Sequence, residues 1–598
     1  MGIKFFLDTY LPHQHYLQVE MEVHPKKKET FLSIPTWSPG SYKIRDYAKS
    51  IHKVRLVNPK SGWTIEQTDL DTWKVYSKGE TFHVSYLVYG YEHTVRTNYF
   101  TSEFMLIHPP ATFLYAKDLI TSEVEVSWKS IAPFKHCYTG LKRKENAKLT
   151  WKASNIDELF DSPILLSNEK EIGFETRSCH FDLVVLGNIP NTEKRKIAAD
   201  LSKVVDMQIR CMGGTENSYY LFILDMTENL YGGLEHLNCS VNQFDPIGAF
   251  SGENYRTLIE LLSHEYFHHW NVKRIRPIAL GPFDYQKPNL TKELWIAEGI
   301  TSFFDAYFLL LCDIYNPQQY LNKLWKDIRE LEESEGESWM SLEESSFTAW
   351  TKYYNRPLDP NFGNTGISYY TKGAILSLSF QLFVLSETEG KKSLLDIMRE
   401  LYKNYYLEKK RGFTKAEFFQ AAKKVVGVDL KLEFDPYITE PKRIPIEKYL
   451  AKIGIERTSS PPELEPGFRA RDEKGRLVLS KINLSKPIKN TDLSTGDEWI
   501  SIDGIRALPN NFKDLLKKYK PGQKAELLIS RRGTILKRKI QFDKKPSSNE
   551  LWINDKVDET TLSLREIFLS LKPRRNIVSK VESKKKKIGV AAKTIKSR

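Results

Sequence analysis

Apolar and polar residues alternate in the first part of the chain with the period of two that is typical of β-strands. The segments 16–24, 81–89 and 124–128 carry apolar side chains at every second position. Proline and glycine residues punctuate the stretches between them. Short alternating strands with such punctuation predict a β-sandwich, which we assign to residues 1–170.

Residues 171–450 change to a mostly helical pattern. The segment "YYLFILDM" at 219–226 predicts one strand. Three long segments repeat apolar residues at helical spacing: 293–314, 368–387 and 414–426. The last of them opens with Thr414 and Glu417, which form a capping box. This region is therefore expected to be a mixed α+β domain dominated by helices.

The chain returns to a β pattern after the proline-rich segment 459–468. Three short strands are expected around one helix, "NNFKDLLKKY" at 510–519. We assign residues 451–545 to this compact module and 546–598 to a basic C-terminal tail. The fold class is thus a multidomain α+β protein.

Charge is concentrated at the C-terminal end. The net charge is +13, but from Lys572 onward eleven lysines and arginines face a single acidic residue, Glu582. The remainder of the chain is therefore nearly neutral, and we expect a solvated extension and no nucleic-acid partner. An apolar content of 40% is that of a folded globular protein.

The cysteines and the apolar runs bear on the cellular compartment. Five cysteines are dispersed without a C-x-x-C pair, which favours free thiols in a reducing compartment. The N-terminus lacks the apolar core of a signal peptide, and the most apolar run, 303–315, is too short to span a bilayer. The sequence therefore predicts a soluble, cytoplasmic protein without a membrane span.

The segment "SHEYFHHW" at 263–270 is rich in potential metal ligands. His264 and His268 are four positions apart, so on a helix their imidazoles share one face. Glu265 lies beside the first of them. This is the H-E-x-x-H pattern, in which two histidines bind zinc and the glutamate is the general base. A helix with ordinary histidines would show the same letters, so a third ligand is needed.

Glu298 is the candidate for the third ligand. It lies in "ELWIAEGITSFFDAY" (293–307), whose spacing predicts a buried helix, where a lone carboxylate needs a metal or another partner. An ion-paired core glutamate is the alternative. Asp305, on the same helix face, would be able to accept a hydrogen bond from a ligand histidine. Three protein ligands would hold one zinc ion per chain and leave a position for water.

Several of these segments together resemble a known family. "HEYFHHWNVKRIRP", "GPFDY" and "LWIAEGITSFFD", with "IPTWSPGSYKIRDY" at 34–47, are similar to the glycyl aminopeptidases, zinc metallopeptidases related to aminopeptidase N and thermolysin. The resemblance implies a thermolysin-like catalytic domain behind the N-terminal β domain. It also implies hydrolysis of the first peptide bond of substrates with a free N-terminus, with a preference for small first residues such as Gly or Ala.

The resemblance also gives a meaning to "YGGLEHLNCS" at 231–240, which by itself reads as a Gly-Gly turn leading into a strand. A comparable strand holds the peptide along the active site of these enzymes. Gly232 and Gly233 would line it, and Glu235 would bind the substrate's free α-amine. A carboxylate facing an ammonium in a water-poor cleft selects chain ends strongly.

Two further motifs carry weight only through resemblance. "SYYTKGAILSL" at 368–378 is similar to a Tyr-x-Lys-Gly motif whose tyrosine donates to the oxyanion; Tyr370 is the expected residue and Tyr369 the alternative. The C-terminal module resembles a PDZ domain. Its loop at 466–468 lacks the preceding Gly-Leu of the family, so capture of a peptide C-terminus and docking on its own catalytic domain both stay open.

The leading interpretation is a zinc-dependent aminopeptidase acting on peptide substrates. One alternative is a zinc endopeptidase assisted by the PDZ module, and another is a non-catalytic PDZ scaffold. Glu235 separates the first two, because an endopeptidase does not need a carboxylate for the substrate amine. The presence of ligands, base and candidate tyrosine together argues against the scaffold. The sequence leaves the oligomeric state and the physiological substrate open.

Overall fold

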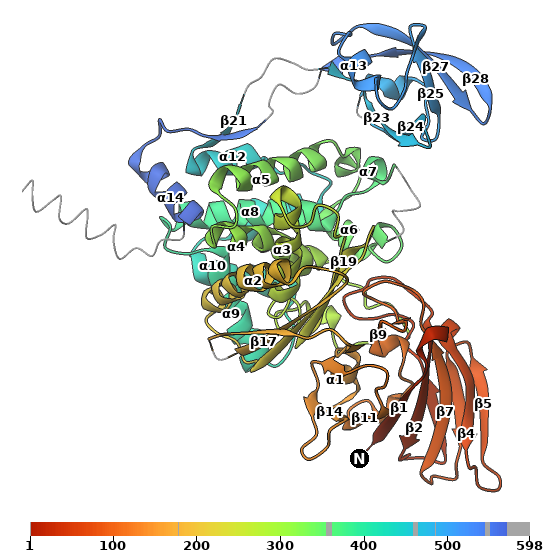
Figure 1. Cartoon of the computed structure of the whole chain (residues 1–598). Coiled ribbons are helices and arrows are strands. Elements are labelled where there is room, and N and C mark those ends of the chain that lie inside the picture. Colours follow the sequence, from red (N-terminus) through yellow and green to blue (C-terminus); the bar gives the residue numbers. More distant parts are fainter. Residues whose placement is uncertain are drawn as a thin grey trace, which may run out of the picture.

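The computed structural model describes residues 2–177, 179–354, 361–458, 464–484, 486–544 and 550–570. Figure 1 shows a β domain in red and orange, a mostly helical body from yellow to cyan, and a small blue module at the opposite end. No described helix combines the length and the apolar character needed to cross a membrane. The prediction of a multidomain α+β fold with an N-terminal β-rich domain is confirmed.

The N-terminal domain is built from three sheets that share one core. The largest has the order β13-β14-β11-β1-β2-β7-β4, with β1 parallel to β11 and antiparallel to β2. Its strands are β1 (Ile3–Leu11), β2 (Tyr16–Val23), β4 (Ile51–Val57), β7 (Phe82–Tyr89), β11 (Val124–Ser130), β13 (Lys142–Arg143) and β14 (Thr150–Ala153). Every second side chain of β2 is buried, as its alternating sequence predicts.

Two four-stranded sheets complete this domain. One consists of β10 (Tyr115–Ala116), β3 (Glu29–Ser33), β6 (Thr72–Tyr76) and β5 (Thr64–Asp69), and the other of β12 (His136–Thr139), β15 (Ile164–Ser167), β9 (Phe104–Ile107) and β8 (Tyr99–Phe100). The short helix α1 (Ile156–Phe160) follows β14. Tyr285, from the helical body, is buried in this domain's core and donates its hydroxyl to Asp157 at 2.5 Å. The two domains are therefore packed together, not merely linked.

The helical body begins with a five-stranded sheet of order β16-β17-β18-β20-β19. Its strands are β16 (Ile172–Thr176), β17 (Cys179–Leu186), β18 (Tyr219–Met226), β20 (Cys239–Phe244) and β19 (Tyr231–Glu235). β17, β18 and β20 are parallel, and β19 runs antiparallel to β20 at the end of the sheet. β19 thus has a strand partner on one side only among the described residues.

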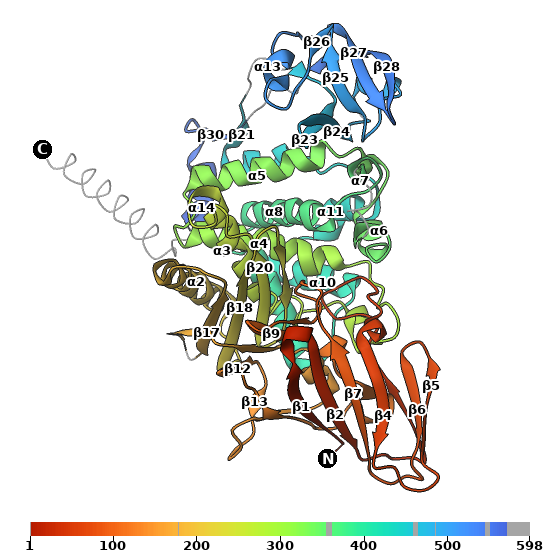
Figure 2. The ribbon, with the colours of Figure 1, turned by 45° about the vertical axis from the view of Figure 1, so that its right-hand side comes forward.

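Long and short helices make up the rest of this body and pack on the sheet and against one another (Figure 2). They are α2 (Asn191–Met212), α3 (Gly252–Phe267), α4 (Ile300–Leu311), α5 (Pro317–Glu332), α6 (Leu342–Phe347), α7 (Phe362–Thr365), α8 (Tyr369–Glu387), α9 (Leu394–Leu401), α10 (Lys415–Val426), α11 (Leu430–Thr439) and α12 (Ile446–Leu450). A π-helical turn, Trp295–Gly299, leads directly into α4. α10 opens with the predicted capping box of Thr414 and Glu417.

The backbones of α8 and of the turn before α4 touch at two glycines. A Cβ on Gly299 would lie 2.5 Å from Gly373 Cα, so neither position has room for a side chain. Gly299 follows Glu298 directly, and Gly373 lies three residues after Tyr370. This contact therefore sets the distance between two segments that carry predicted site residues.

The blue module has its own core and a sheet of order β23-β24-β25-β27-β28. Its elements are β23 (Phe468–Glu473), β24 (Arg476–Ile482), β25 (Glu498–Ile502), β26 (Ile505–Arg506), α13 (Phe512–Leu516), β27 (Lys524–Arg531) and β28 (Thr534–Gln541). The predicted helix at 510–519 corresponds to the shorter α13. Arg469 reaches Glu333, just beyond α5, at 2.6 Å, so the module contacts the helical body at its β23 edge.

The predicted boundaries of the last two segments, 451–545 and 546–598, need correction. β21 (Ile455–Arg457) pairs with β30 (Leu551–Ile553), and α14 (Glu559–Ser570) packs against the helical body, where Phe568 is fully buried. The apolar pair Leu564 and Phe568, four positions apart, is the helical signal that the assignment to a tail overlooked. The lysine-rich part from Lys572 lies outside the described residues.

Candidate metal centre and substrate cleft

His264, His268 and Glu298 come together at the base of a cleft. The two Nε2 atoms are 3.0 Å apart, and Glu298 Oε2 lies 3.5 Å from His264 Nε2 and 3.2 Å from His268 Nε2. Ligand atoms bound to a tetrahedral zinc stand roughly 3.3–3.6 Å from one another. Two imidazoles and one carboxylate at this mutual spacing fit such an ion.

Hydrogen bonds on the far side of each imidazole hold the two histidines in orientation. His264 Nδ1 donates to Asp305 Oδ2 at 3.0 Å, and His268 Nδ1 donates to the backbone oxygen of Asn271 at 2.6 Å. Each bond directs the unprotonated Nε2 into the cleft, as a metal ligand requires. The expected contact between Asp305 and one of the two predicted ligand histidines is therefore present.

Asn271 connects the helix of the two histidines to the turn that carries Glu298. Its Nδ2 donates to the backbone oxygens of Ile296 and Ala297 at 2.9 and 3.0 Å. Glu298 is 2% exposed, and burial would raise its pKa, but His268 and His264 beside it outweigh burial and lower it. The carboxylate is thus held ionised and in place.

Glu265, the expected base, lies on the neighbouring side of the cleft. Its side chain is 5% exposed, and its Oε2 has no hydrogen-bond partner within the described part of the chain. Burial raises its pKa to about 7, opposed by the nearby His264 and His268. A buried carboxylate that accepts protons near neutral pH is suited to act as a general base.

The edge strand β19 lines the cleft opposite α3. A Cβ on Gly233 would lie 1.9 Å from Glu265 Oε1, so only glycine allows the strand and the carboxylate to approach this closely. Gly232 lines the same cavity and has φ +155°. The predicted pair of glycines is therefore located where strand and base meet.

Glu235, at the end of β19, is 4% exposed, and its Oε1 has no partner among the residues that the structure describes. Oxygen and nitrogen atoms of Glu235, Glu265 and His268 lie within 4.8 Å of one another. Gly40, from the N-terminal domain, lies against Glu235, because a Cβ there would stand 2.7 Å from both carboxylate oxygens. The N-terminal domain thus closes the cleft at this carboxylate.

Tyr370 lines the cleft, whereas Tyr369 does not. Ser368 caps α8 by accepting a hydrogen bond from the Thr371 backbone, which puts both tyrosines in the first turn of the helix. Tyr370 lies near the candidate metal ligands, with its ring centroid 6.3 Å from that of His264, and its hydroxyl is 3.3 Å from that of Tyr354. Tyr369 is fully buried behind it.

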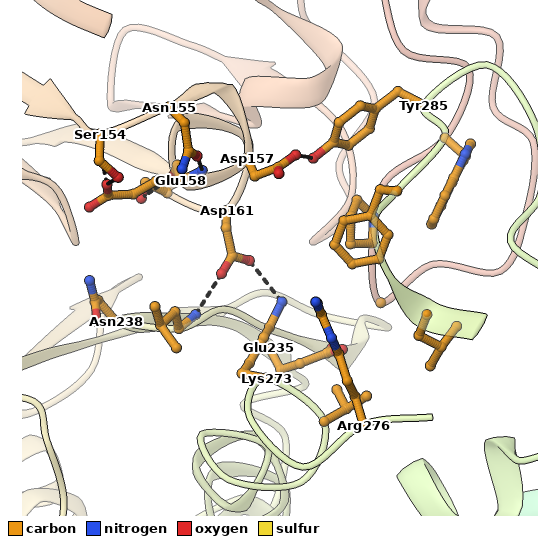
Figure 3. A pocket seen from close by; sticks show the side chains of 18 of the residues that line it. Ser154, Asn155, Asp157, Glu158, Asp161, Glu235, Asn238, Lys273, Arg276 and Tyr285 are labelled. Carbon is orange, nitrogen blue, oxygen red and sulfur yellow. Dashed lines mark hydrogen bonds and ion pairs between the residues drawn. The ribbon is translucent and has the colours of Figure 1, made fainter. Parts of the chain in front are cut away.

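The cleft at His264, His268 and Glu298 is a cavity of about 350 Å³, which we call the main cavity. A second cavity of about 390 Å³ shares Gly40 and Glu235 with it. Figure 3 shows the second cavity, where Asp161 accepts hydrogen bonds from Lys273 Nζ at 2.8 Å and from the Leu237 backbone at 2.9 Å. Glu235 therefore stands in the partition between two cavities.

Sequence reasoning missed several of the residues that line the main cavity, among them Gly40, Arg96 and Tyr354. Gly40 lies in the segment 34–47 whose resemblance was noted, but nothing there marks it as a neighbour of Glu235. Arg96 and Tyr354 carry no motif. Arg96 reaches the cleft through the packing of the N-terminal domain, and Tyr354 through the fold of the segment after α6, and spacing along the chain encodes neither.

Two family models match the chain. Residues 257–376 match the M61 glycyl aminopeptidase model, and residues 5–168 match the model of the peptidase M61 N-terminal domain. Both matches are to the M61 glycyl aminopeptidase family. The first covers the segment from α3 to α8, with the three predicted metal ligands, and the second covers the N-terminal β domain. The M61 family is a peptidase family, so the matches support aminopeptidase activity.

Several solved structures are similar to this chain. The crystal structure of an aminopeptidase N family protein from Idiomarina loihiensis aligns with a TM-score of 0.87 and 25% identity, over 94% of this chain and 99% of that chain. Yeast LTA4 hydrolase in complex with bestatin gives a TM-score of 0.43 and 12% identity, over 74% of this chain and 68% of that chain. An M1 zinc metallopeptidase from Deinococcus radiodurans gives 0.44 and 12%, over 75% and 95%. A comparison with curated proteins finds no match.

Proposed function

We propose that the chain is a zinc-dependent aminopeptidase with one zinc per chain, held by His264, His268 and Glu298. The observation that carries the proposal is the position of Glu235, a buried carboxylate with an unpartnered oxygen beside the base and one metal ligand. A substrate ammonium would satisfy that oxygen and bring the first peptide bond to the metal.

When bound, zinc would lower the pKa of its water and polarise the scissile carbonyl. Glu265 takes the proton of the attacking water and returns it to the departing amine. Tyr370 donates a hydrogen bond to the carbonyl oxygen as negative charge develops there. Glu235 holds the ammonium throughout, and β19, with Gly232 and Gly233, aligns the substrate backbone.

A preference for small first residues such as Gly or Ala is part of the proposal. The match to the glycyl aminopeptidase model supports this preference. Gly40 also supports it, because its backbone lies directly against the carboxylate that would hold the amine and limits the space there. The same contact argues against an endopeptidase, because that enzyme would need the cleft to continue past Glu235. A non-catalytic scaffold has no use for two neighbouring buried carboxylates, Glu235 and Glu265, that each keep one oxygen without a partner among the described residues.

We further propose that the helical body is a thermolysin-like catalytic domain and that the blue module is PDZ-like. The order of the proposed ligands along the chain, two at α3 and one in the π-helical turn, supports the assignment of the catalytic domain. The sheet of β23 to β28 with α13 supports the PDZ-like assignment. The module would bind a peptide ligand or act through its contact with the body at Arg469 and Glu333. All five cysteines are unpaired, which supports a reducing, cytoplasmic location.

The deciding experiment compares alanine p-nitroanilide with its blocked counterpart, N-acetyl-alanine p-nitroanilide, with and without chelator. We expect hydrolysis of the free-amine substrate only, loss with chelator and recovery with added zinc. His264→Ala should lose metal and activity together. The matched variant Glu265→Gln should keep the metal and lose the rate, because it removes the base and not a ligand. Wild-type activity in Glu265→Gln would refute the mechanism.

A further inference from the structure

Arg96 brings a positive charge from the N-terminal domain into the cleft. It lies in the loop between β7 and β8 and is the only lysine or arginine among the described residues that line the main cavity. The loop is fixed at this point, because Tyr47 donates its hydroxyl to the Arg96 backbone oxygen at 2.8 Å. The Arg96 side chain donates from Nη2 to the backbone oxygen of Gly233 at 2.8 Å. The guanidinium is therefore anchored on the strand that would hold the substrate.

Most of the donors of this guanidinium are unused. Nε is buried without a partner, and within the described ranges Nη1 also has none. Neither Glu235 nor Glu265 forms an ion pair with Arg96, although the charges of both act on it. A guanidinium has five N–H groups and no acceptor, so an anion entering the cleft would find donors ready for it.

The spacing along β19 indicates which anion fits. Gly233, where Arg96 is anchored, is two residues before Glu235, which corresponds to roughly 7 Å of extended strand. A substrate lying alongside β19 with its ammonium at Glu235 would have its second residue opposite Gly233. In a dipeptide, that second residue ends in a free carboxylate. A longer peptide presents a neutral amide at the same place.

We propose that Arg96 binds the C-terminal carboxylate of dipeptides and makes them the favoured substrate class of this cleft. The inference rests on the proposed aminopeptidase function, in which Glu235 holds the amine. The two ends of the substrate would then be recognised by two opposite charges contributed by two different domains. Arg96 is in this sense a specificity-determining residue, and the chemistry of bond cleavage stays with Glu265 and Tyr370.

The test compares three substrates that share an N-terminal alanine: Ala-Ala, Ala-Ala-amide and alanine p-nitroanilide. Only the first has a carboxylate at the second residue. We expect the full-length enzyme to hydrolyse Ala-Ala with a kcat/KM about 30- to 1,000-fold above that of the amide, the value of one charge-assisted bond in a desolvated cleft. Arg96→Gln should remove this preference, chiefly by raising the KM for Ala-Ala, and Arg96→Lys should restore part of it.

Arg276→Gln is the matched control. Arg276 lines the second cavity and has no ion pair among the described residues, so its loss removes a nearby positive charge without touching the cleft. In this variant, the ratio of kcat/KM for Ala-Ala to kcat/KM for Ala-Ala-amide should equal that of the wild type. Equal loss on all three substrates in Arg96→Gln would mean that Arg96 only supports β19, and would overturn the proposal.

The wild type alone provides a second test that does not depend on a variant folding. If the enzyme hydrolyses Ala-Ala and Ala-Ala-amide equally well, the cleft does not bind the substrate carboxylate, and the proposal is wrong. An enzyme that leaves all three substrates intact, with zinc bound, would instead contradict the proposed aminopeptidase function. A preference for Ala-Ala-Ala over Ala-Ala would place the carboxylate site one residue further along, against our assignment to Gly233.

Discussion

The carboxylate of Glu265 occupies the space in which a side chain at Gly233 would begin, 1.9 Å from the position of its Cβ. We therefore expect Gly233→Ala to displace the base and to lower kcat by about 100-fold, since a shift of roughly 1 Å has effects of that size. Zinc content should not change. The control is Gly173→Ala on β16 of the same sheet, where a Cβ has no neighbour closer than 3.3 Å. Full activity in Gly233→Ala would show that Glu265 does not need its present position.

Glu235→Ala tests whether one carboxylate selects chain ends. Loss of a charge-assisted bond in a desolvated cleft should lower kcat/KM on alanine p-nitroanilide about 30- to 1,000-fold, with zinc retained. N-acetylated peptides should be poor substrates before and after the change. Glu235→Gln keeps the shape beside Gly40 without the charge, and it should lose nearly as much. If the Gln variant is as active as the wild type, charge is not what holds the amine.

Asp305→Asn tests the hydrogen bond that orients His264. An amide can take the place of the carboxylate but accepts the Nδ1 proton less strongly, so the imidazole becomes a weaker ligand. We expect zinc affinity to fall about 10- to 100-fold, measured by competition with a chromogenic chelator. Activity at saturating zinc should largely recover. Unchanged zinc affinity would mean that the hydrogen bond between His268 and Asn271, together with the packing of α3, is enough to orient the two histidines.

Asp161 provides a pH-dependent contact between the N-terminal domain and the helical body. Burial would raise its pKa, but Lys273 and the hydrogen bond with His236 outweigh burial and lower the pKa to about 2. Since the folded value lies below the unfolded value of 3.8, the stabilisation is present above about pH 4 and is lost as the pH falls toward 2.

This shift corresponds to about 2 kcal/mol. We expect Asp161→Asn to lower the free energy of unfolding by about that amount at pH 7, measured with urea. The difference from wild type should shrink as the pH approaches 2. A difference that stays constant from pH 7 to pH 2 would show that the charge of Asp161 is not responsible.

Phe568 tests whether α14 belongs to the helical body. Its side chain is fully buried, with ring centroids 5.2 Å from Tyr307 and 6.2 Å from Tyr320, and Tyr307 donates its hydroxyl to the Phe568 backbone oxygen. Phe568→Ala should lower the free energy of unfolding by about 3–5 kcal/mol. Leu562→Ala on the same helix, where the leucine is 40% exposed, should cost less than about 1 kcal/mol. Similar thermal midpoints for the two variants would contradict the packing.

The sequence was most informative where chemistry follows local spacing. The four-residue interval of His264 and His268 and the isolated acidic residue Glu298 on an apolar helix both have direct physical meanings. Glu235 and Tyr370 are different, because their surroundings along the chain look like an ordinary strand and an ordinary helix start. Their expected roles came from resemblance and stay predictions until tested.

Other features depend on contacts between distant segments and could not be read from spacing. Arg96 meets Gly233 across 137 positions, through the docking of one domain on another. The boundary of the C-terminal tail was misplaced for a related reason. Charge dominates the composition after Lys572, whereas the helix just before it is stabilised by partners more than 200 residues away.

The pairing of β21 with β30 makes the blue module an insertion and not an appendage. The chain leaves the helical body at Arg457, builds the module, and returns at Leu551, which pairs directly with Arg457. During synthesis from the N-terminus, the module is therefore complete before β30 and α14 exist. The aromatic cluster of Tyr307 and Tyr320 is incomplete until Phe568, one of the last described residues to leave the ribosome, has been synthesised. The helical body thus begins to form before the module and is completed after it.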